Sequence, residues 1–177
     1  METSPPNQIL ELLFTFPRKQ FSYRDIERNT DLSIGTISKY VPLLEKQDLL
    51  KRDVRPTAKY VSANFSNPTF RQLKRANNLK KLYESNIINE LEIKLRPTSI
   101  VLFGSYSRGE DTEESDIDIA ILRGRKFQLN RKPFEKKLQR HINLTQIQRV
   151  TKMQDEFKQT LINAIVVSGL LSDMNGF

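Results

Sequence analysis

The feature that most constrains the fold is an apolar run that stops at Gly-Ser and resumes after an acidic stretch. Residues 101–122 read VLFGSYSRGEDTEESDIDIAIL. Residues two apart on a strand point to the same face of a sheet. If DIDIAIL is a strand, its isoleucines share one face, and Asp116 and Asp118 project together from the other. The pattern therefore predicts two neighbouring carboxylates at the start of an otherwise buried strand.

Two ionised carboxylates at this range repel each other unless a cation lies between them. Oxygen ligands without His or Cys suit a hard ion, Mg²⁺ or Mn²⁺. Mg²⁺ usually completes its coordination with waters and substrate phosphates, which favours a nucleoside triphosphate (NTP) as substrate. We therefore predict that Asp116 and Asp118 are metal ligands and catalytic residues.

The Gly-Ser pair follows the first apolar run directly and opens a helical turn, which favours a phosphate site. Gly104 lets a phosphate approach the backbone, and the N–H groups at the turn, with the Ser105 hydroxyl, can hold it. Arg108 is placed to add a charge-assisted contact. These three residues are the predicted nucleotide-binding set. The other acids of the stretch are expected to form a solvated loop; they are Glu110, Asp111, Glu113 and Glu114.

GSYSRGEDTEESDIDIAIL resembles the Gly-Ser … Asp-x-Asp signature of the DNA polymerase β-like nucleotidyltransferase superfamily, and is most similar to its minimal nucleotidyltransferase domains. The resemblance extends in layout over about residues 80–170. It implies a small mixed sheet and transfer of a nucleoside monophosphate from an NTP to a hydroxyl group. It also implies two Mg²⁺ or Mn²⁺ ions, one at the attacking hydroxyl and one at the leaving pyrophosphate.

The superfamily normally carries a third carboxylate on a later strand. Here that strand is predicted in HINLTQIQ, residues 141–148, where the acid's position falls on Asn143 or on Thr145. Neither residue is acidic, and three alternatives follow. The enzyme works slowly with two acids, another acid such as Asp155 or Glu156 reaches the site, or the domain binds nucleotide without turnover.

The N-terminal region has the pattern of three short helices and a basic hairpin. The first helix is predicted at 6–16. A second helix begins after Ser22 as its N-cap, and a third spans 34–47 after Ser33 as its N-cap. Short strands at 49–50 and 60–61 flank a basic loop. The stretches FSYRDIERNTDLSIGTISKYVPLLEKQDLLKR and AKYVSAN resemble a winged helix-turn-helix. Pro42 departs from the pattern and should kink the third helix or end it early.

The winged-helix resemblance implies that the third helix and the wing bind DNA. On the helix the candidate residues are Thr36, Ser38, Lys39 and Tyr40. On the wing, Lys51, Arg52, Arg55 and Lys59 would contact phosphates. The alternative is a wing that serves protein contacts or dimerisation.

Together these patterns predict an α+β chain of two domains. The winged helix-turn-helix takes residues 1–65, a connecting helix takes 66–81, and the nucleotidyltransferase domain takes 82–177. A helix is expected over 82–95, and the tail FKQTLINAIVVSGLL resembles the closing helix of the family, with Phe157, Leu161, Ile165 and Val166 packing on the sheet. As a whole the chain resembles archaeal winged-helix nucleotidyltransferase proteins.

Charge and composition narrow the choice of partners. The formal net charge is +8, and residues 123–140 carry eight Lys or Arg side chains against Glu135. This cluster is either a track for a polyanionic acceptor such as tRNA or DNA, or a solvated helix face. The absence of Cys excludes disulfides and a Cys nucleophile. The sequence shows no membrane span and no secretory signal, so we expect a cytoplasmic location.

Two functions remain open from the sequence. The first is an Mg²⁺-dependent nucleotidyltransferase acting on a nucleic acid or on a protein, because minimal domains related to this one often modify a toxin partner. The second is a DNA-binding regulator whose transferase domain binds nucleotide but is weakly active or inactive. The lack of an acid at Asn143 favours the second, and the intact Gly-Ser and Asp-x-Asp favour the first. Homodimerisation is compatible with both.

Overall fold

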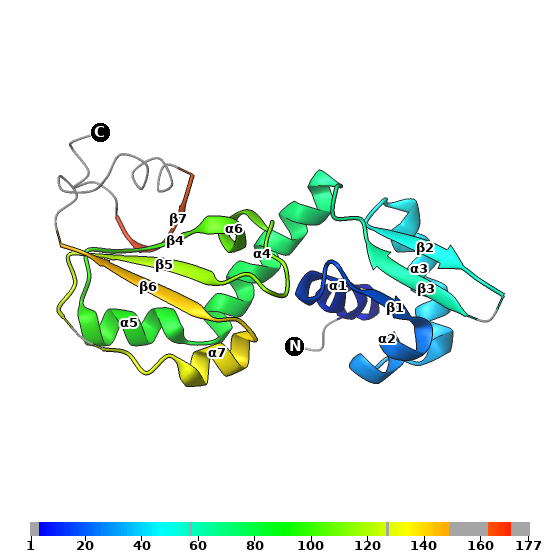
Figure 1. The fold of residues 1–177 in the computed structure, drawn as a ribbon, viewed down its shortest axis with the longest axis horizontal. Coiled ribbons are helices and arrows are strands. Elements are labelled where there is room, and N and C mark those ends of the chain that lie inside the picture. Colours follow the sequence, from blue (N-terminus) through cyan, green and yellow to red (C-terminus); the bar gives the residue numbers. More distant parts are fainter. Residues whose placement is uncertain (1–3, 57, 127, 149–162, 171–177) are drawn as a thin grey trace. The chain divides into compact units, whose positions relative to one another are not determined.

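The computed structural model describes residues 4–56, 58–126, 128–148 and 163–170 (Figure 1). The chain divides into two compact units, Met1–Asn77 and Asn78–Phe177. Within the described ranges, no helix is both long enough and apolar enough to cross a bilayer.

Three helices form the N-terminal unit: α1 (Pro5–Thr15), α2 (Tyr23–Asn29) and α3 (Ile34–Lys46). The Ser22 hydroxyl accepts the Asp25 N–H at 3.1 Å, and the Asp25 carboxylate accepts the Ser22 N–H at 2.9 Å. This reciprocal pair is a capping box. Ser33 accepts the Thr36 N–H at 3.3 Å at the start of α3. Both predicted caps are therefore confirmed.

Pro42 lies inside α3, which continues to Lys46. Of the two expected effects of this proline, the early end of the helix is therefore wrong. Proline removes one helical N–H, so the carbonyl four residues earlier, that of Ser38, loses its partner. Ser38 is exposed, and water can satisfy that carbonyl.

A three-stranded antiparallel sheet completes the unit, in the order β1-β3-β2. Its strands are β1 (Gln20–Ser22), β2 (Leu50–Val54) and β3 (Lys59–Ala63). The predicted hairpin is present, but its strands extend into the stretch expected to be a basic loop. The short strand β1 was not predicted. The sheet and helices share a core that includes Ile9, Leu13, Ile26, Ile37 and Val61.

Helix α4 (Pro68–Glu84) occupies the region of the predicted connecting helix and extends past it. Helix α5 (Ile87–Leu95) follows after a break at Asn86, whose φ of 70° is left-handed. The single helix expected over 82–95 is therefore split. Its first residue, Leu82, belongs to α4.

The C-terminal unit contains a mixed sheet in the order β6-β5-β4-β7 (Figure 1). The strands are β4 (Ser99–Phe103), β5 (Ile117–Leu122), β6 (Ile142–Ile147) and β7 (Ile165–Gly169). Strand β4 pairs antiparallel with β5 and β7, and β5 pairs parallel with β6. The strands predicted in DIDIAIL and in HINLTQIQ are confirmed as β5 and β6.

The tail departs from its predicted form. Ile165 and Val166, expected in a closing helix, lie in β7 and pair with Leu102 and Val101 of β4. Ile-Val-Val is a β-branched run, which favours a strand over a helix. Phe157 and Leu161 lie outside the described residues.

The two faces of this sheet carry different residues, because successive side chains of β5 alternate between them. The isoleucines of β5 pack with Ile87 and Leu91 of α5 and with Leu138 of α7 (Lys132–Leu138). Ala120 lies on the opposite face with Val101. Because Asp116 and Asp118 precede Ala120 at alternate positions, they belong to this second face.

Candidate active site

The two predicted metal ligands lie at the N-terminal end of β5. Asp116 immediately precedes the strand and Asp118 is its second residue, and both are half-buried. In the register of the sheet Asp118 stands between two partners, Phe103 of β4 and Asn143 of β6. Asp118 is therefore held between strands on both sides, and Asp116 lies just before the strand.

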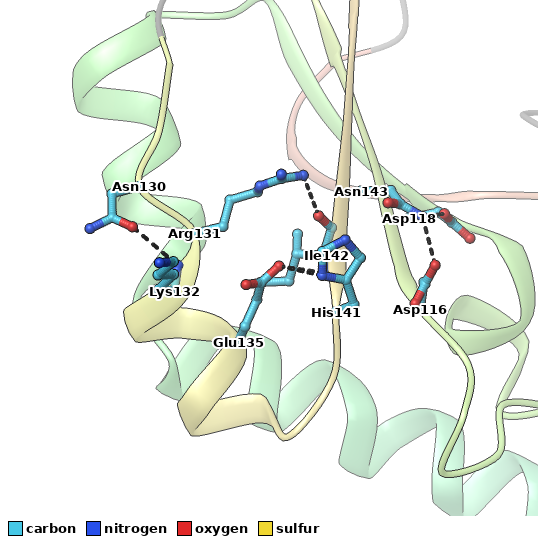
Figure 2. A network of polar contacts seen from close by, with 9 residues as sticks. All are labelled: Asp116, Asp118, Asn130, Arg131, Lys132, Glu135, His141, Ile142 and Asn143. Carbon is cyan, nitrogen blue, oxygen red and sulfur yellow. Dashed lines mark hydrogen bonds and ion pairs between the residues drawn. The ribbon is translucent and has the colours of Figure 1, made fainter.

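Asn143 binds both carboxylates (Figure 2). Its Nδ2 lies 3.0 Å from Asp116 Oδ2 and 3.1 Å from Asp118 Oδ1. Ionised carboxylates only accept hydrogen bonds, and an amide NH₂ has two hydrogens to donate. One hydrogen therefore serves each acid. Of the two candidates for the third-ligand position, Asn143 is the one beside the acids, since Thr145 is paired with Ala120, two residues further along β5.

Gly104 lies against Asp118. It follows Phe103, the register partner of Asp118, and opens the short helix α6 (Gly104–Arg108). Its φ is +75°, and a Cβ at this position would clash with the Asp118 carboxylate. Only glycine satisfies both conditions without strain. The Gly-Ser bend and the acidic pair are thus adjacent.

Arg108, predicted to contact a phosphate, is the last residue of α6. Its Nε donates to Glu110 Oε2 at 2.6 Å, and both side chains are partly exposed. The guanidinium is therefore already occupied by an ion pair. To contact a triphosphate it can use the N–H groups of its two Nη atoms or exchange Glu110 for the phosphate.

Asp111 corrects the expectation of a solvated acidic loop. Its side chain is fully buried, and Asn78 Nδ2 donates to its Oδ1 at 2.7 Å and to the Tyr106 carbonyl at 3.0 Å. Burial raises the pKa of the Tyr106 phenol well above its usual value, the Asp111 charge raises it further, and Arg140 opposes both. Asp111 thus anchors the loop, and no local sequence pattern marks it.

Side chains of α7 fix the start of β6 (Figure 2). Glu135 Oε1 accepts the Ile142 N–H at 3.0 Å and lies 2.9 Å from His141 Nδ1. Arg131, just before the helix, donates to the Ile142 carbonyl at 2.7 Å. Both backbone groups of Ile142 are therefore bound, one residue before Asn143. Sequence reasoning missed these supporting residues because their roles depend on contacts across the chain.

The donor atoms of this site are carboxylate oxygens, which suit a hard divalent cation. Among the described residues there is no cluster of three or more His, Cys, Asp or Glu side chains suited to a metal ion. Two carboxylates converge, however, and Gly104 leaves the space next to Asp118 free of a side chain. Oxygen donors of this kind suit Mg²⁺ or Mn²⁺. The residues fit one such ion, held by Asp116 and Asp118. The alternative acids Asp155 and Glu156 lie outside the described residues.

The basic cluster of residues 123–140 is less uniform than expected. Arg140 is buried and donates to the Gln139 carbonyl at 2.8 Å, and Arg131 is bound to β6. The exposed cations are Arg123, Arg125, Lys126, Lys132, Lys136 and Lys137. A track for a polyanion would therefore have to use the exposed set.

On α3, the candidate DNA-contact residues are partly committed to other interactions. The Thr36 hydroxyl lies 3.0 Å from Ser33 Oγ at the helix cap, and the Lys39 ammonium lies 5.3 Å from the centroid of the Tyr40 ring. Ser38 is exposed, as is Lys39. Two of the four candidate residues are therefore exposed.

The hairpin cations divide into paired and unpaired ones. Arg52 forms an ion pair with Glu45. Arg55 forms one with Asp53 at 2.6 Å, which raises the pKa of the Arg55 guanidinium, and it also lies over the Tyr60 ring. Lys51 and Lys59 are exposed, and Lys59 lies over the Tyr23 ring at 5.9 Å.

Residues 84–170 match the family model of the nucleotidyltransferase domain. The matched residues include the Gly-Ser bend, both aspartates and Asn143, so this part of the chain is similar to a nucleotidyltransferase domain.

Two curated proteins of Methanocaldococcus jannaschii resemble shorter stretches. One, named "Putative protein adenylyltransferase MJ1379", is 64% identical over 31 residues, which are 18% of this chain and 31% of the relative. The other, named "Putative protein adenylyltransferase MJ0604", is 57% identical over 37 residues, 20% of this chain and 37% of the relative. The chain spans about a third of the length of these relatives. No solved structure matches it.

Proposed function

We propose that the chain is a protein adenylyltransferase, which moves AMP from ATP to a hydroxyl group of a partner protein with Mg²⁺ or Mn²⁺ at Asp116 and Asp118. The observation that carries the proposal is the convergence of these two acids with Gly104. The choice of ATP and of a protein acceptor rests on the names of the two relatives.

In the proposed reaction the acceptor oxygen bonds to the α-phosphorus of ATP. The bond from that phosphorus to the bridging oxygen breaks, and pyrophosphate leaves. A bound cation supplies charge neutralisation for the triphosphate. Asp116 and Asp118 hold the cation, and the bend at Gly104 and Ser105 receives the phosphates next to it. Asn143 has no basic site at neutral pH, so the acceptor's proton goes to another base or to water.

The test is transfer of label from α-labelled ATP to proteins of a cell lysate in the presence of Mg²⁺. We expect Asp116→Asn and Asp118→Asn each to lower transfer by about 100-fold or more, because each loses a charged oxygen ligand. Glu114→Gln is the matched control, since Glu114 is an exposed acid of the same stretch. Parallel reactions with total RNA, and with CTP, GTP and UTP, test the acceptor and the base. Transfer to RNA alone would contradict a protein acceptor.

A second candidate function is favoured by one observation, the amide of Asn143 where the superfamily carries an acid. In that case the chain is a DNA-binding regulator that binds nucleotide with little or no transfer. The N-terminal unit would then act as a winged helix, with Ser38 and Lys39 of α3 toward the bases and Lys51 and Lys59 of the hairpin toward phosphates.

The ion pairs of the hairpin provide a control for testing the DNA-binding function. We expect a Lys51→Ala, Lys59→Ala double variant to reduce the salt dependence of DNA binding by a slope of about two. Arg52→Ala is the comparison variant: Arg52 already has Glu45 as its partner, so its loss should change the slope less. DNA binding that is unaffected by the double variant would contradict the proposed interface.

A further inference from the structure

Asn143 occupies the predicted third-ligand position, and its amide contacts give it a further role. We infer that its amide is a built-in substitute for the cation, which holds Asp116 and Asp118 together when no metal is bound and must release them when one binds. The inference rests on the proposed cation site at the two aspartates. It assigns Asn143 as a positioning residue for the acidic pair.

The first argument is the orientation of the amide. Nδ2 faces one oxygen of each carboxylate, at 3.0 and 3.1 Å. If the amide were turned over, its Oδ1 would face two anions and be repelled. In the absence of a cation, only the donor orientation is favourable. Both hydrogens of the NH₂ group are then used, so neither is left for a substrate.

The second argument is electrostatic. Two half-buried carboxylates on one strand face repel each other when both are ionised. Hydrogen bonds from a polar N–H group to a charged oxygen are stronger than bonds between neutral groups, and they offset part of this repulsion. The amide thus does part of what a cation would do, but without a full positive charge.

The third argument is that Asn143 is held in place without the help of a metal. Its partner in the parallel ladder is Asp118. The preceding residue, Ile142, has its N–H bound by Glu135 and its carbonyl bound by Arg131. The backbone at this point is therefore fixed by protein contacts, and the amide is presented to the acids in advance.

A competition follows from these contacts. A cation at the acids attracts an amide oxygen and repels an amide NH₂ group, so binding of the ion breaks two hydrogen bonds and favours a turned amide. The wild-type protein should then bind the ion less tightly than a variant with an acid at this position. Without a metal ion, the two hydrogen bonds from Asn143 keep the carboxylates of Asp116 and Asp118 together.

The experiment is scanning calorimetry of the full chain in EDTA and over a series of Mn²⁺ concentrations. The variants are Asn143→Ala, which removes the amide, and Asn143→Asp, which replaces it by an acid. The control is Thr145→Ala, an exposed position two residues along β6. In EDTA we expect Asn143→Ala to lower the Tm by about 4 °C or more, Asn143→Asp to lower it further, and Thr145→Ala to change it little.

With Mn²⁺ we expect the variants that are least stable in EDTA to gain the most in Tm. Mn²⁺ should raise the Tm of Asn143→Ala by more than it raises that of the wild type. Asn143→Asp should reach half of its maximal stabilisation at an Mn²⁺ concentration about tenfold or more below that of the wild type. If Asn143→Ala matches Thr145→Ala in EDTA and the wild type in its response to Mn²⁺, the inference is wrong and the proposed function stands. If Mn²⁺ stabilises no variant, Asn143→Asp included, the cation site itself is wrong and the inference falls with it.

Discussion

The carboxylate of Asp118 fills the space in which a side chain on Gly104 would begin. The contact follows from sheet register, because Phe103 is the partner of Asp118 and Gly104 is the next residue along the chain. The end of β4 therefore brings the proposed phosphate-binding bend and a proposed metal ligand together with no side chain between them. The spacing between Gly-Ser and Asp-x-Asp in the sequence serves this one contact.

Gly104→Ala should abolish most of the transfer activity. The new Cβ collides with the Asp118 carboxylate, and the left-handed backbone disfavours any residue with a Cβ. We expect a loss of about 100-fold in activity, measured by label transfer, and about 1–2 kcal/mol in stability, measured by urea unfolding. Gly35→Ala is the matched control, because its Cβ would meet only Ser33 Oγ at 3.8 Å. Wild-type activity in Gly104→Ala would contradict the site.

Glu110→Gln should improve the binding of ATP. The substitution weakens the ion pair that occupies Arg108 and leaves its guanidinium available for the triphosphate. Because exposed ion pairs contribute about 1 kcal/mol or less, we expect the KM for ATP to fall by about two- to fivefold. Arg108→Ala should raise the KM. If neither variant changes the KM, Arg108 does not contact the nucleotide.

Asn78→Ala should destabilise the C-terminal unit without touching the acids of the site. The amide of Asn78 donates to Asp111 and to the Tyr106 carbonyl, and all three groups are buried. A buried acceptor that loses its donor costs about 1–3 kcal/mol, which urea unfolding measures. Asn89→Ala, at an exposed position of α5, is the control. Equal stability of the two variants would show that the Asn78 contacts contribute nothing.

The capping box of α2 should make part of the stability depend on pH. The Ser22 hydroxyl and backbone N–H both donate to Asp25 and lower the pKa of its carboxyl. A pKa that is lower in the folded state stabilises the protein above the unfolded value of about 3.8. This contribution is lost as the pH falls through the folded pKa. Asp25→Asn should therefore lower the Tm at pH 7 but not at about pH 2.

Asp31→Asn is the control for the capping box, since Asp31 is an exposed acid in the same unit. The Tm difference between Asp25→Asn and the wild type, followed by calorimetry from pH 7 downward, should disappear over the acid range. A difference that persists at low pH would mean that the Asp25 charge is not what stabilises the cap.

Much of the site was predictable from local patterns. The alternation in DIDIAIL placed Asp116 and Asp118 on one face because side chains on a strand repeat every two residues. Ser22 and Ser33 were recognisable as caps because a hydroxyl before an amphipathic run satisfies free helix N–H groups. In each case the structure depends on residues close together in the chain.

What could not be predicted depends on contacts between distant segments. Asp111 stands in a run of acids that looks solvated, and its burial depends on Asn78, 33 residues earlier. The donor role of Asn143 follows from the parallel register with β5, which no local pattern specifies. Strand β7 is a different case: its β-branched run favours a strand, and the helix that the family resemblance implied at Ile165 and Val166 is wrong.

The parallel pairing of β5 with β6 also governs when the acidic pair gains its hydrogen-bond donor during synthesis. Asp116 and Asp118 leave the ribosome before Asn143, and the intervening segment with α7 must cross back before the amide reaches them. Closing such a connection requires contacts far apart in the chain, which form late. A nascent chain that ends before β6 therefore exposes two mutually repelling acids, and we expect free Mg²⁺ in the cell to be their first partner.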